Sequence, residues 1–413
     1  MLKTRRTFTK LSAALLGALA ISPLARAADD DIVIGHHGPL TGPASWVGLG
    51  GRDGAMMAMD DINAAGGING RKLRMISYDD AGKPSEAELV ARKMIESDKV
   101  FAILGSGVSA TAVAVAQDAH RAKIPYFNGT GSTVKIIDAQ SRWVFSGASN
   151  DSRDSAENEA TFIGNYLKVK KVAVIHQTDE NSTQVAEGVL RLIKERYGVE
   201  VLTRQTYNPG ETDFTSQLLA VRRTNPEYIL LFSYYVEAAR LVRQARELGI
   251  KTPIKGDGSI TNAGFLTVAG PAAEGMIVSY SPLYYRGNQV RDMVEFEARF
   301  KAKYPSYPAD RPNLVDCYGY GNMYALAEGM RRAGKDMTRK GLVDALETLN
   351  EFKPSENWPK AVNVTQPITY TVSHNGNRRL SFFKVVNGTF QPIVEYKAPV
   401  PTLKFPANAS LNW

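Results

Sequence analysis

The chain has 413 residues, a formal net charge of +8 and one cysteine, Cys317. A single cysteine excludes an internal disulfide, and the cysteine and histidine residues lack the spacing of a structural zinc site. The length predicts about two domains, each stabilised by a packed hydrophobic core.

The first 27 residues have the features of a removable export signal. Basic residues precede an apolar run at 11–21, which is far shorter than the roughly 20 residues that span a bilayer. The small residues Ala25 and Ala27 favour cleavage before Ala28. The segment at 4–10 resembles a twin-arginine signal, and an ordinary Sec signal is the alternative. Either signal directs the protein out of the bacterial cytoplasm.

Removal of this segment lowers the formal charge from +8 to +3, because it contains five basic residues and no acidic one. The five are Lys3, Arg5, Arg6, Lys10 and Arg26. A charge this small, without a run of lysine or arginine, argues against nucleic acid as a partner.

From residue 29 onward, short β-branched runs alternate with longer helical stretches, a pattern typical of parallel sheets covered by helices on both faces. The first block predicts strands at 32–35, 72–79, 101–104 and 124–127 and helices at 51–65, 85–97 and 109–122. The second block predicts helices at 152–167, 182–197, 214–224 and 236–248 and strands at 171–176, 200–207 and 228–232. The remainder predicts helices near 288–303, 316–333 and 338–349 and strands at 366–372, 380–386 and 389–396. No repeat or low-complexity linker separates the blocks, so we expect function in a cleft between them.

The segment at 101–111 passes from a strand through Gly105 and Gly107 into a helix that opens at Ser109. Unpaired N–H groups and a partial positive charge at a helix N-terminus bind anions such as carboxylates. Ser109 and Thr111 are therefore candidate ligand residues, and the alternative for Ser109 is a simple helix cap.

The same segment also matches the Gly-x-Gly-x-x-Ala dinucleotide fingerprint at 105–110. A dinucleotide site requires this motif after the first strand and an acidic residue about 20 positions later. Here the motif follows the third strand and 123–126 contains no acid, so we expect no cofactor.

Two further segments follow predicted strands. The hydroxyls and carbonyls of 128–133 are placed to accept hydrogen bonds from an ammonium group, or they serve as turn residues. His36 and His37 are expected to be loop residues rather than metal ligands, because adjacent side chains point in different directions and no further ligand is evident.

Several motifs together resemble the periplasmic leucine/isoleucine/valine-binding protein family. They are Ile34-Gly35 with the segment Gly38 to Pro43, the segment Asp60 to Gly70, Tyr78 to Ala81, Leu241 to Gly249, and Ala273 to Met276. The likeness extends to about residue 350 and fades beyond it. It implies a type I periplasmic binding protein with an α/β fold, in which two Rossmann-like lobes joined by three hinge strands close over a solute in the interlobe cleft. The implied lobes are 28–150 plus about 282–360, and 151–281 plus about 361–413.

The resemblance also implies roles for individual residues. Trp46 corresponds to an aromatic wall, Val108 and Ser109 to a carboxylate-binding pair, and Thr130 and Ser132 to residues that hold the ammonium and carboxylate groups. Tyr234 corresponds to the tyrosine of the second lobe that closes on the solute. The chain departs from the family at Asn181-Ser182, where members that bind aliphatic amino acids have Tyr-Gly, so Asn181 is a candidate ligand residue. Asp257 is the candidate partner of the ammonium group, although it lies one position early.

The resemblance implies a periplasmic binding protein that is monomeric and is not an enzyme. Such a protein captures an amino acid or a related carboxylate and delivers it to the permease subunits of an ABC transporter at the inner membrane. A sensor of the same fold is one alternative. The other is an exported enzyme, which is disfavoured because the chain has no Gly-x-Ser-x-Gly or His-Glu-x-x-His motif.

Overall fold

The computed structural model describes residues 31–397 except 106, 138–141, 148–150, 262, 281–288, 308–310, 336, 372–373 and 377–378. The expected export signal at 1–27 lies outside these residues. Within the described part of the chain, every helix is too short or too polar to cross a membrane.

The first lobe is built on a five-stranded parallel sheet with the order β2-β1-β3-β4-β5. Its elements are β1 (Ile32–Gly38), α1 (Ser45–Ala64), β2 (Leu73–Asp79), α2 (Pro84–Arg92), η2 (Lys93–Ser97), β3 (Ala102–Leu104), α3 (Ser109–Ala122), β4 (Tyr126–Asn128), η3 (Val134–Ile136) and β5 (Val144–Ser146). Apolar residues of α2 and α3 form one core cluster with one face of this sheet, and those of α1 pack in a second cluster with the other face. The predicted parallel α/β arrangement is confirmed.

The second lobe contains a seven-stranded sheet with the order β12-β11-β10-β9-β8-β6-β7. Its elements are α4 (Ser152–Thr161), η4 (Phe162–Leu167), β6 (Lys171–Gln177), α5 (Glu180–Tyr197), β7 (Glu200–Tyr207), α6 (Thr215–Thr224), β8 (Tyr228–Phe232), α7 (Tyr235–Glu247), β9 (Ile254–Gly256), η5 (Gly258–Ile260), α8 (Ala263–Ala269), η6 (Gly270–Ala273), β10 (Ile277–Tyr280), β11 (Arg379–Val386) and β12 (Thr389–Lys397). Strands β6 to β10 are parallel, whereas β11 and β12 form an antiparallel hairpin at the edge.

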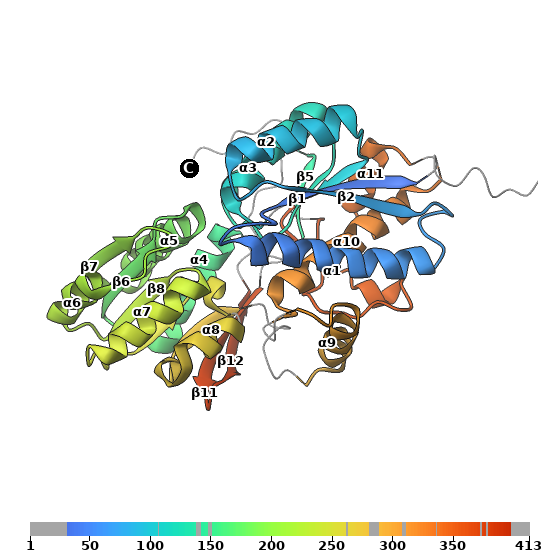
Figure 1. Cartoon of the computed structure of the whole chain (residues 1–413). Coiled ribbons are helices and arrows are strands. Elements are labelled where there is room, and N and C mark those ends of the chain that lie inside the picture. Colours follow the sequence, from blue (N-terminus) through green and yellow to red (C-terminus); the bar gives the residue numbers. More distant parts are fainter. Residues whose placement is uncertain are drawn as a thin grey trace, which may run out of the picture.

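The chain returns to the first lobe between β10 and β11. The returning elements are α9 (Arg291–Lys303), α10 (Leu314–Ala333), α11 (Arg339–Leu346) and η7 (Pro354–Glu356). Figure 1 shows α10 and α11 beside α1 and the first sheet, while β11 and β12 lie with the second lobe. Helices α1 and α10 approach closely because Gly54 and Gly319 have no side chain. A Cβ at Gly54 would lie 1.9 Å from a backbone oxygen of α10, and a Cβ at Gly319 would lie 2.2 Å from a backbone oxygen of α1.

The last crossing into the second lobe occurs near residue 377. Phe352 pairs with Ile368 in an isolated bridge, and Asn375 pairs with Ser146 of β5. The second bridge places Asn375 beside the first sheet, whereas the resemblance implied that about 361–413 belongs to the second lobe. The three crossings include 148–150, 281–288 and 377–378, so the implied hinge falls largely outside the described residues.

Three local expectations from the sequence are wrong. The helix expected at 51–65 begins earlier, at Ser45. Of the strand expected at 366–372, the described residues 366–371 form one isolated bridge, at Ile368. His36 and His37 are not in a loop, because β1 extends to Gly38 and buries both side chains. Histidine is an uncommon strand residue, and its position in β1 depends on neighbouring side chains that lie far away in the sequence.

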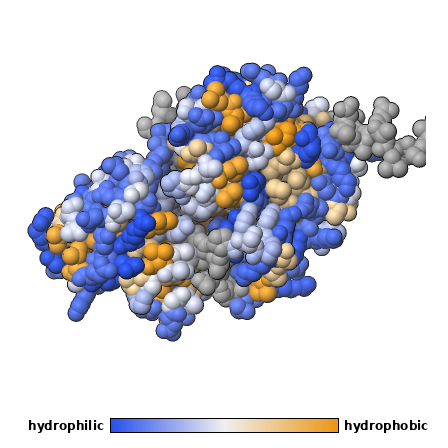
Figure 2. Space-filling view, in the orientation of Figure 1, coloured by the Kyte–Doolittle hydropathy of each residue, from blue (hydrophilic) through white to orange (hydrophobic). Residues whose placement is uncertain are grey.

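Figure 2 shows that the apolar residues on this face of the molecule form small, separated groups among hydrophilic ones. The large apolar side chains that are most exposed are Leu89, Tyr166, Val268, Val290 and Val294. Scattered apolar residues of this kind are normal on a protein surface and mark no site.

Candidate functional site

A cavity of about 850 Å³, including its mouth open to solvent, lies between the two lobes. From the first lobe it is lined by Trp46, Val47, Gly107, Ser109, Thr130, Ser132, Leu314, Val315 and Tyr318. From the second lobe it is lined by Ser155, Glu159, Asn181, Val185, Tyr234, Asp257, Gly258, Ser259, Ser279, Tyr280 and Leu380. Its mixture of aromatic and polar residues suits a small organic solute.

The first-lobe wall is formed by the N-terminus of α3 and by the loop after β4. Ser109 is the first residue of α3, and its Oγ accepts a hydrogen bond from the backbone N–H of Ser132 at 3.2 Å. This bond fixes the two segments against each other. The first-turn N–H groups of a helix have no partner within the helix. With the nearby hydroxyls they form a neutral wall that favours an anionic group.

Gly107 allows the two segments of this wall to meet. A Cβ at Gly107 would lie 2.0 Å from Cγ1 of Val47 and 2.1 Å from Oγ1 of Thr130. A glycine is therefore required at this position for steric reasons. The preceding residue, Ser106, lies outside the described residues.

The structure does not bring Val108 and Thr111 into the lining of the cavity. Val108 caps α3 through its backbone, and the hydroxyl of Thr111 donates to the carbonyl of Val108 at 3.0 Å. Because Thr111 is two residues beyond Ser109, the helical twist turns its side chain into the protein, where it is fully buried.

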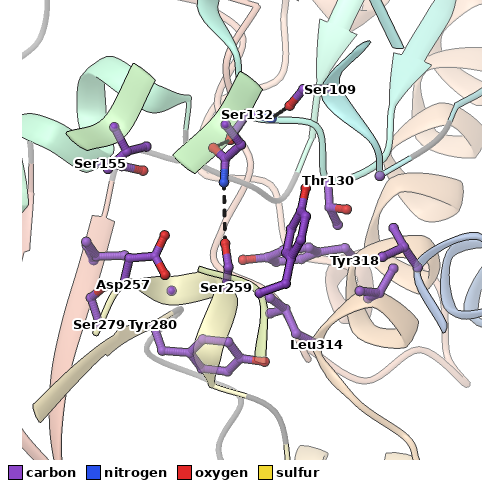
Figure 3. A pocket seen from close by; sticks show the side chains of 18 of the residues that line it. Ser109, Thr130, Ser132, Ser155, Asp257, Ser259, Ser279, Tyr280, Leu314 and Tyr318 are labelled. Atoms are coloured by element: carbon purple, nitrogen blue, oxygen red, sulfur yellow. Dashed lines mark hydrogen bonds between the residues drawn. The ribbon is translucent and has the colours of Figure 1, made fainter. Parts of the chain in front are cut away.

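Asn181 links the two lobes at the cavity. It lies in the first turn of α5, which Asp179 caps by accepting a hydrogen bond from the backbone N–H of Ser182 at 3.0 Å. The Asn181 Oδ1 accepts a hydrogen bond from the Ser132 hydroxyl of the first lobe. Its Nδ2 donates to Oγ of Ser259 at 3.3 Å, the dashed line in Figure 3. Asn181 therefore contacts polar groups of both walls.

Tyr234 lies at the junction of β8 and α7. Its backbone N–H donates to Oε1 of Gln177 at 3.3 Å, which positions the turn. Burial, together with the nearby Asp179, raises the pKa of Tyr234 above its ordinary value, so its hydroxyl stays protonated and able to donate. The adjacent Tyr235 packs edge-on against Trp46 of the first lobe, with ring centroids 5.2 Å apart. Aromatic side chains of both lobes thus meet at the cavity.

Asp257 follows β9 and is 4% exposed. Its Oδ1 has no hydrogen-bond partner among the residues that the structure describes. Burial raises the pKa of Asp257 to about 8; Lys255 opposes this rise and Glu159 adds to it. Without a bound cation the carboxyl is therefore mainly protonated at neutral pH, and an arriving ammonium group favours its ionised form.

A buried ion pair lies beside Asp257. Lys255 pairs with Glu159, and both side chains are 1% exposed. Glu159 also accepts a hydrogen bond from the hydroxyl of Ser279. This wall therefore contains two acids and one base. It is formally neutral while Asp257 is protonated, and it gains a net negative charge when a cationic group ionises Asp257. Figure 3 shows Asp257, Ser155 and Ser279 on the same side of the cavity.

Seven of the nine residues expected from the sequence line the cavity, as given above. Several polar residues of the second-lobe wall were not expected from the sequence, namely Ser155, Glu159, Ser259, Ser279 and Tyr280. They lie within helices and strands, where no local pattern distinguishes a cavity residue from a core residue. Among the described residues, His, Cys, Asp and Glu side chains form no group suited to a metal ion.

Comparisons with known proteins agree with this architecture. A family model described as periplasmic binding protein matches residues 31–389. An "Amino acid binding protein" of Pseudomonas aeruginosa is 30% identical over 322 residues, which is 77% of this chain and 83% of that protein. The Leu/Ile/Val-binding protein of Escherichia coli is 27% identical over 273 residues, or 65% of this chain and 73% of that protein.

Two solved structures share the fold at lower identity. LivJ of Streptococcus pneumoniae, in complex with isoleucine, has a TM-score of 0.75 and 22% identity over 89% of this chain and 99% of its own. A solute-binding protein of R. palustris, in complex with benzoate, has a TM-score of 0.77 and 19% identity over 90% of this chain and 98% of its own.

Proposed function

The chain belongs to the periplasmic binding protein family, and from this premise we propose that its interlobe cavity captures a small amino acid or a related carboxylate. The family consists of solute-binding proteins of ABC transporters rather than enzymes, and membership implies a periplasmic location. The proposal adds the class of solute, closure of the lobes over it, and its delivery to the permease.

One observation carries the choice of solute: the two walls offer complementary polar groups. The N-terminus of α3, with Ser109 and Ser132, suits a carboxylate. The second lobe presents the buried Oδ1 of Asp257, which has no hydrogen-bond partner within the described part of the chain. A zwitterionic amino acid satisfies both walls. A solute favours closure of the lobes only if it binds the closed state more tightly than the open state. Contacts to both lobes supply this difference in affinity, because they form together only in the closed state.

The side chain of the solute would meet apolar and aromatic groups. Trp46, Tyr234, Leu314 and Leu380 line the cavity together with its polar residues. This lining supports a branched-chain or other hydrophobic amino acid, as in the relatives named for leucine, isoleucine and valine.

An aromatic carboxylate without an amino group is a second candidate. The raised pKa of Asp257 leaves its carboxyl protonated at neutral pH when no cation is present, so this wall also tolerates an uncharged group. The benzoate complex of the R. palustris protein is consistent with this candidate.

A thermal-shift screen followed by calorimetric titration tests the proposal. Isoleucine, phenylalanine, benzoate and succinate are the probes, and a bound probe raises Tm by mass action. If an amino acid is the solute, Asp257→Asn weakens its binding about 10- to 100-fold, whereas benzoate binding changes little. If none of the four probes raises Tm, the proposed solute class is wrong.

Export and delivery are also part of the proposal. If the segment at 4–10 is a twin-arginine signal, replacing Arg5 and Arg6 by lysine blocks appearance of the protein in the periplasm. Unchanged export of that variant would support the Sec alternative. Solute uptake that persists after deletion of the protein, under conditions where its solute is limiting, would favour a sensor.

A further inference from the structure

A second, smaller cavity lies within the first lobe, next to the interlobe cavity. Its space is about that of one water molecule or one hydroxyl group, and we call it the inner chamber. Five residues line both cavities: Val47, Gly107, Thr130, Val315 and Tyr318. The inner chamber is lined in addition by His36, Gly48, Gly51, Gly105, Gly129 and Gly319. The shared lining places the chamber directly beside the interlobe cavity.

The chamber extends from the side of the interlobe cavity that lies away from the acidic wall. In Figure 3, Thr130 and Tyr318, which border the chamber, lie across the cavity from Asp257 and Ser155. A solute with its amino group at Asp257 therefore directs its other end toward the chamber.

His36 presents an unpartnered polar atom in this chamber. Its side chain is 1% exposed and its Nδ1 lies 2.8 Å from Oγ of Ser77, but its Nε2 has no partner among the described residues. In the neighbouring His37 both nitrogens are partnered, by Asp80 at 2.9 Å and by Tyr126 at 3.2 Å. Buried polar atoms are nearly always hydrogen-bonded. The bare Nε2 of His36 therefore indicates a partner that enters the chamber.

The chemistry of that partner follows from the charge of His36. Burial, followed by the proximity of His37 and Arg52, lowers the pKa of His36 to about 3, so the imidazole is neutral at physiological pH. It offers no charge to compensate a buried carboxylate. Its Nε2 either donates or accepts one hydrogen bond, depending on the tautomer, and a hydroxyl group satisfies both cases.

We propose that the inner chamber receives one hydroxyl group at the distal end of the solute, and that this hydroxyl group hydrogen-bonds Nε2 of His36. This inference rests on the proposed function, because it assumes a solute head group held by Ser109, Ser132 and Asp257. It narrows the solute class to small carboxylates that carry a hydroxyl at the end opposite the carboxylate.

Gly51→Ala tests the chamber without disturbing the fold. A Cβ at Gly51 would meet only one atom within 4 Å, Nε2 of His36 at 3.9 Å. Alanine also favours helix, and Gly51 lies within α1. The added methyl group should therefore partly fill the chamber beside His36 while the protein folds normally. Gly341→Ala in α11 is the matched control, because Gly341 lines neither cavity.

The probes are two pairs that differ by one distal hydroxyl: benzoate with 4-hydroxybenzoate, and phenylalanine with tyrosine. In calorimetric titrations of the wild-type protein, the hydroxyl-bearing member of at least one pair should bind about tenfold more tightly, as expected for one buried hydrogen bond. His36→Leu should abolish this preference. Gly51→Ala should reduce it at least threefold, and Gly341→Ala should leave it unchanged.

The outcomes separate this inference from the function on which it rests. Two results would show that the chamber holds only a water molecule and that the inference is wrong. In the first, a pair binds but its two members bind equally tightly. In the second, the hydroxyl-bearing member is preferred, but neither Gly51→Ala nor His36→Leu changes that preference. If none of the four probes binds, while isoleucine and succinate also fail, the proposed function falls and the inference falls with it. If His36→Leu does not fold, Gly51→Ala decides alone.

Discussion

The two walls of the interlobe cavity differ in how their polar groups are partnered. In the first lobe, Ser109 and Ser132 bond to each other, and the wall carries no ionised side chain. In the second lobe, Glu159 and Lys255 form a buried ion pair beside Asp257, whose Oδ1 is left without a hydrogen-bond partner among the described residues.

This difference suggests an order of binding. Under the proposed function, Ser109 and Ser132 are already positioned for a carboxylate, so the first-lobe wall would hold the solute before the lobes close. The second-lobe wall contains a buried acid that gains a partner only when a solute brings one. Closure is therefore favoured by the group on the solute that faces Asp257.

The largest effect is expected from breaking the ion pair of the second-lobe wall. Glu159→Ala leaves the ammonium of Lys255 buried and unpaired, and should lower the free energy of unfolding by about 3–5 kcal/mol in urea titrations. Replacing both residues, as Glu159→Leu with Lys255→Met, should recover most of this loss. A loss below about 1 kcal/mol in the single variant would show that the pair does not organise this wall.

A smaller effect, dependent on pH, is expected at Asp257. Its pKa is raised from 3.8 to about 8 in the folded protein, so folding takes up a proton between these values and stability falls as pH rises from about 4 to about 8. Asp257→Asn removes this loss, and should stabilise the solute-free protein by about 1–2 kcal/mol at pH 7.5 but not at pH 4. Thermal unfolding across this range measures the difference. The surface variant Asp213→Asn is the control, and a gain independent of pH would contradict the account.

The first-lobe wall should respond through affinity rather than stability. Ser109→Ala removes the hydroxyl that accepts from the Ser132 N–H, and should weaken carboxylate binding about tenfold, which corresponds to about 1.4 kcal/mol. Thr111→Ala is the matched control, because Thr111 lies outside the cavity lining. Equal losses in both variants would mean that the whole helix end has shifted, and not that one wall contact was lost.

The smallest effect is expected at the exposed edge between the lobes. Lys135 of the first lobe pairs with Glu180 of the second at 2.7 Å, but their side chains are 61% and 35% exposed. Exposed ion pairs contribute little and are screened by salt. Lys135→Ala should change solute affinity less than twofold, and any change should vanish in 1 M salt. A larger effect that persists in salt would show that this pair controls closure.

Much of the fold could be predicted from the sequence, because parallel α/β units have a strong local signature. The alternation of β-branched runs and amphipathic helices predicted nearly every helix from 84 to 247. Short strands such as β5 and β10 were missed because three or four buried residues resemble any core segment. Residues 366–372 have strand composition, but the described part, 366–371, forms one isolated bridge, between Ile368 and Phe352.

The candidate site, like the fold, contains residues that could be predicted from the sequence and residues that could not. Ser109, Thr130 and Ser132 follow strand ends, where the topology of parallel sheets places ligand residues, so they could be predicted. Glu159 and Ser279 could not, because their contact joins α4 to β10 across 120 positions of the chain. The inner chamber was missed for a similar reason, since His36 depends on Ser77 and on glycines from four other segments.

A crystal structure of the protein with the tightest-binding probe tests the central claim most directly. We expect a carboxylate oxygen within about 3.2 Å of a first-turn N–H of α3 or of the hydroxyls of Ser109 or Ser132. Where the probe has an amino group, we expect its nitrogen within the same distance of a carboxylate oxygen of Asp257. A probe bound outside the cavity, or with its carboxylate against Asp257, would contradict the account.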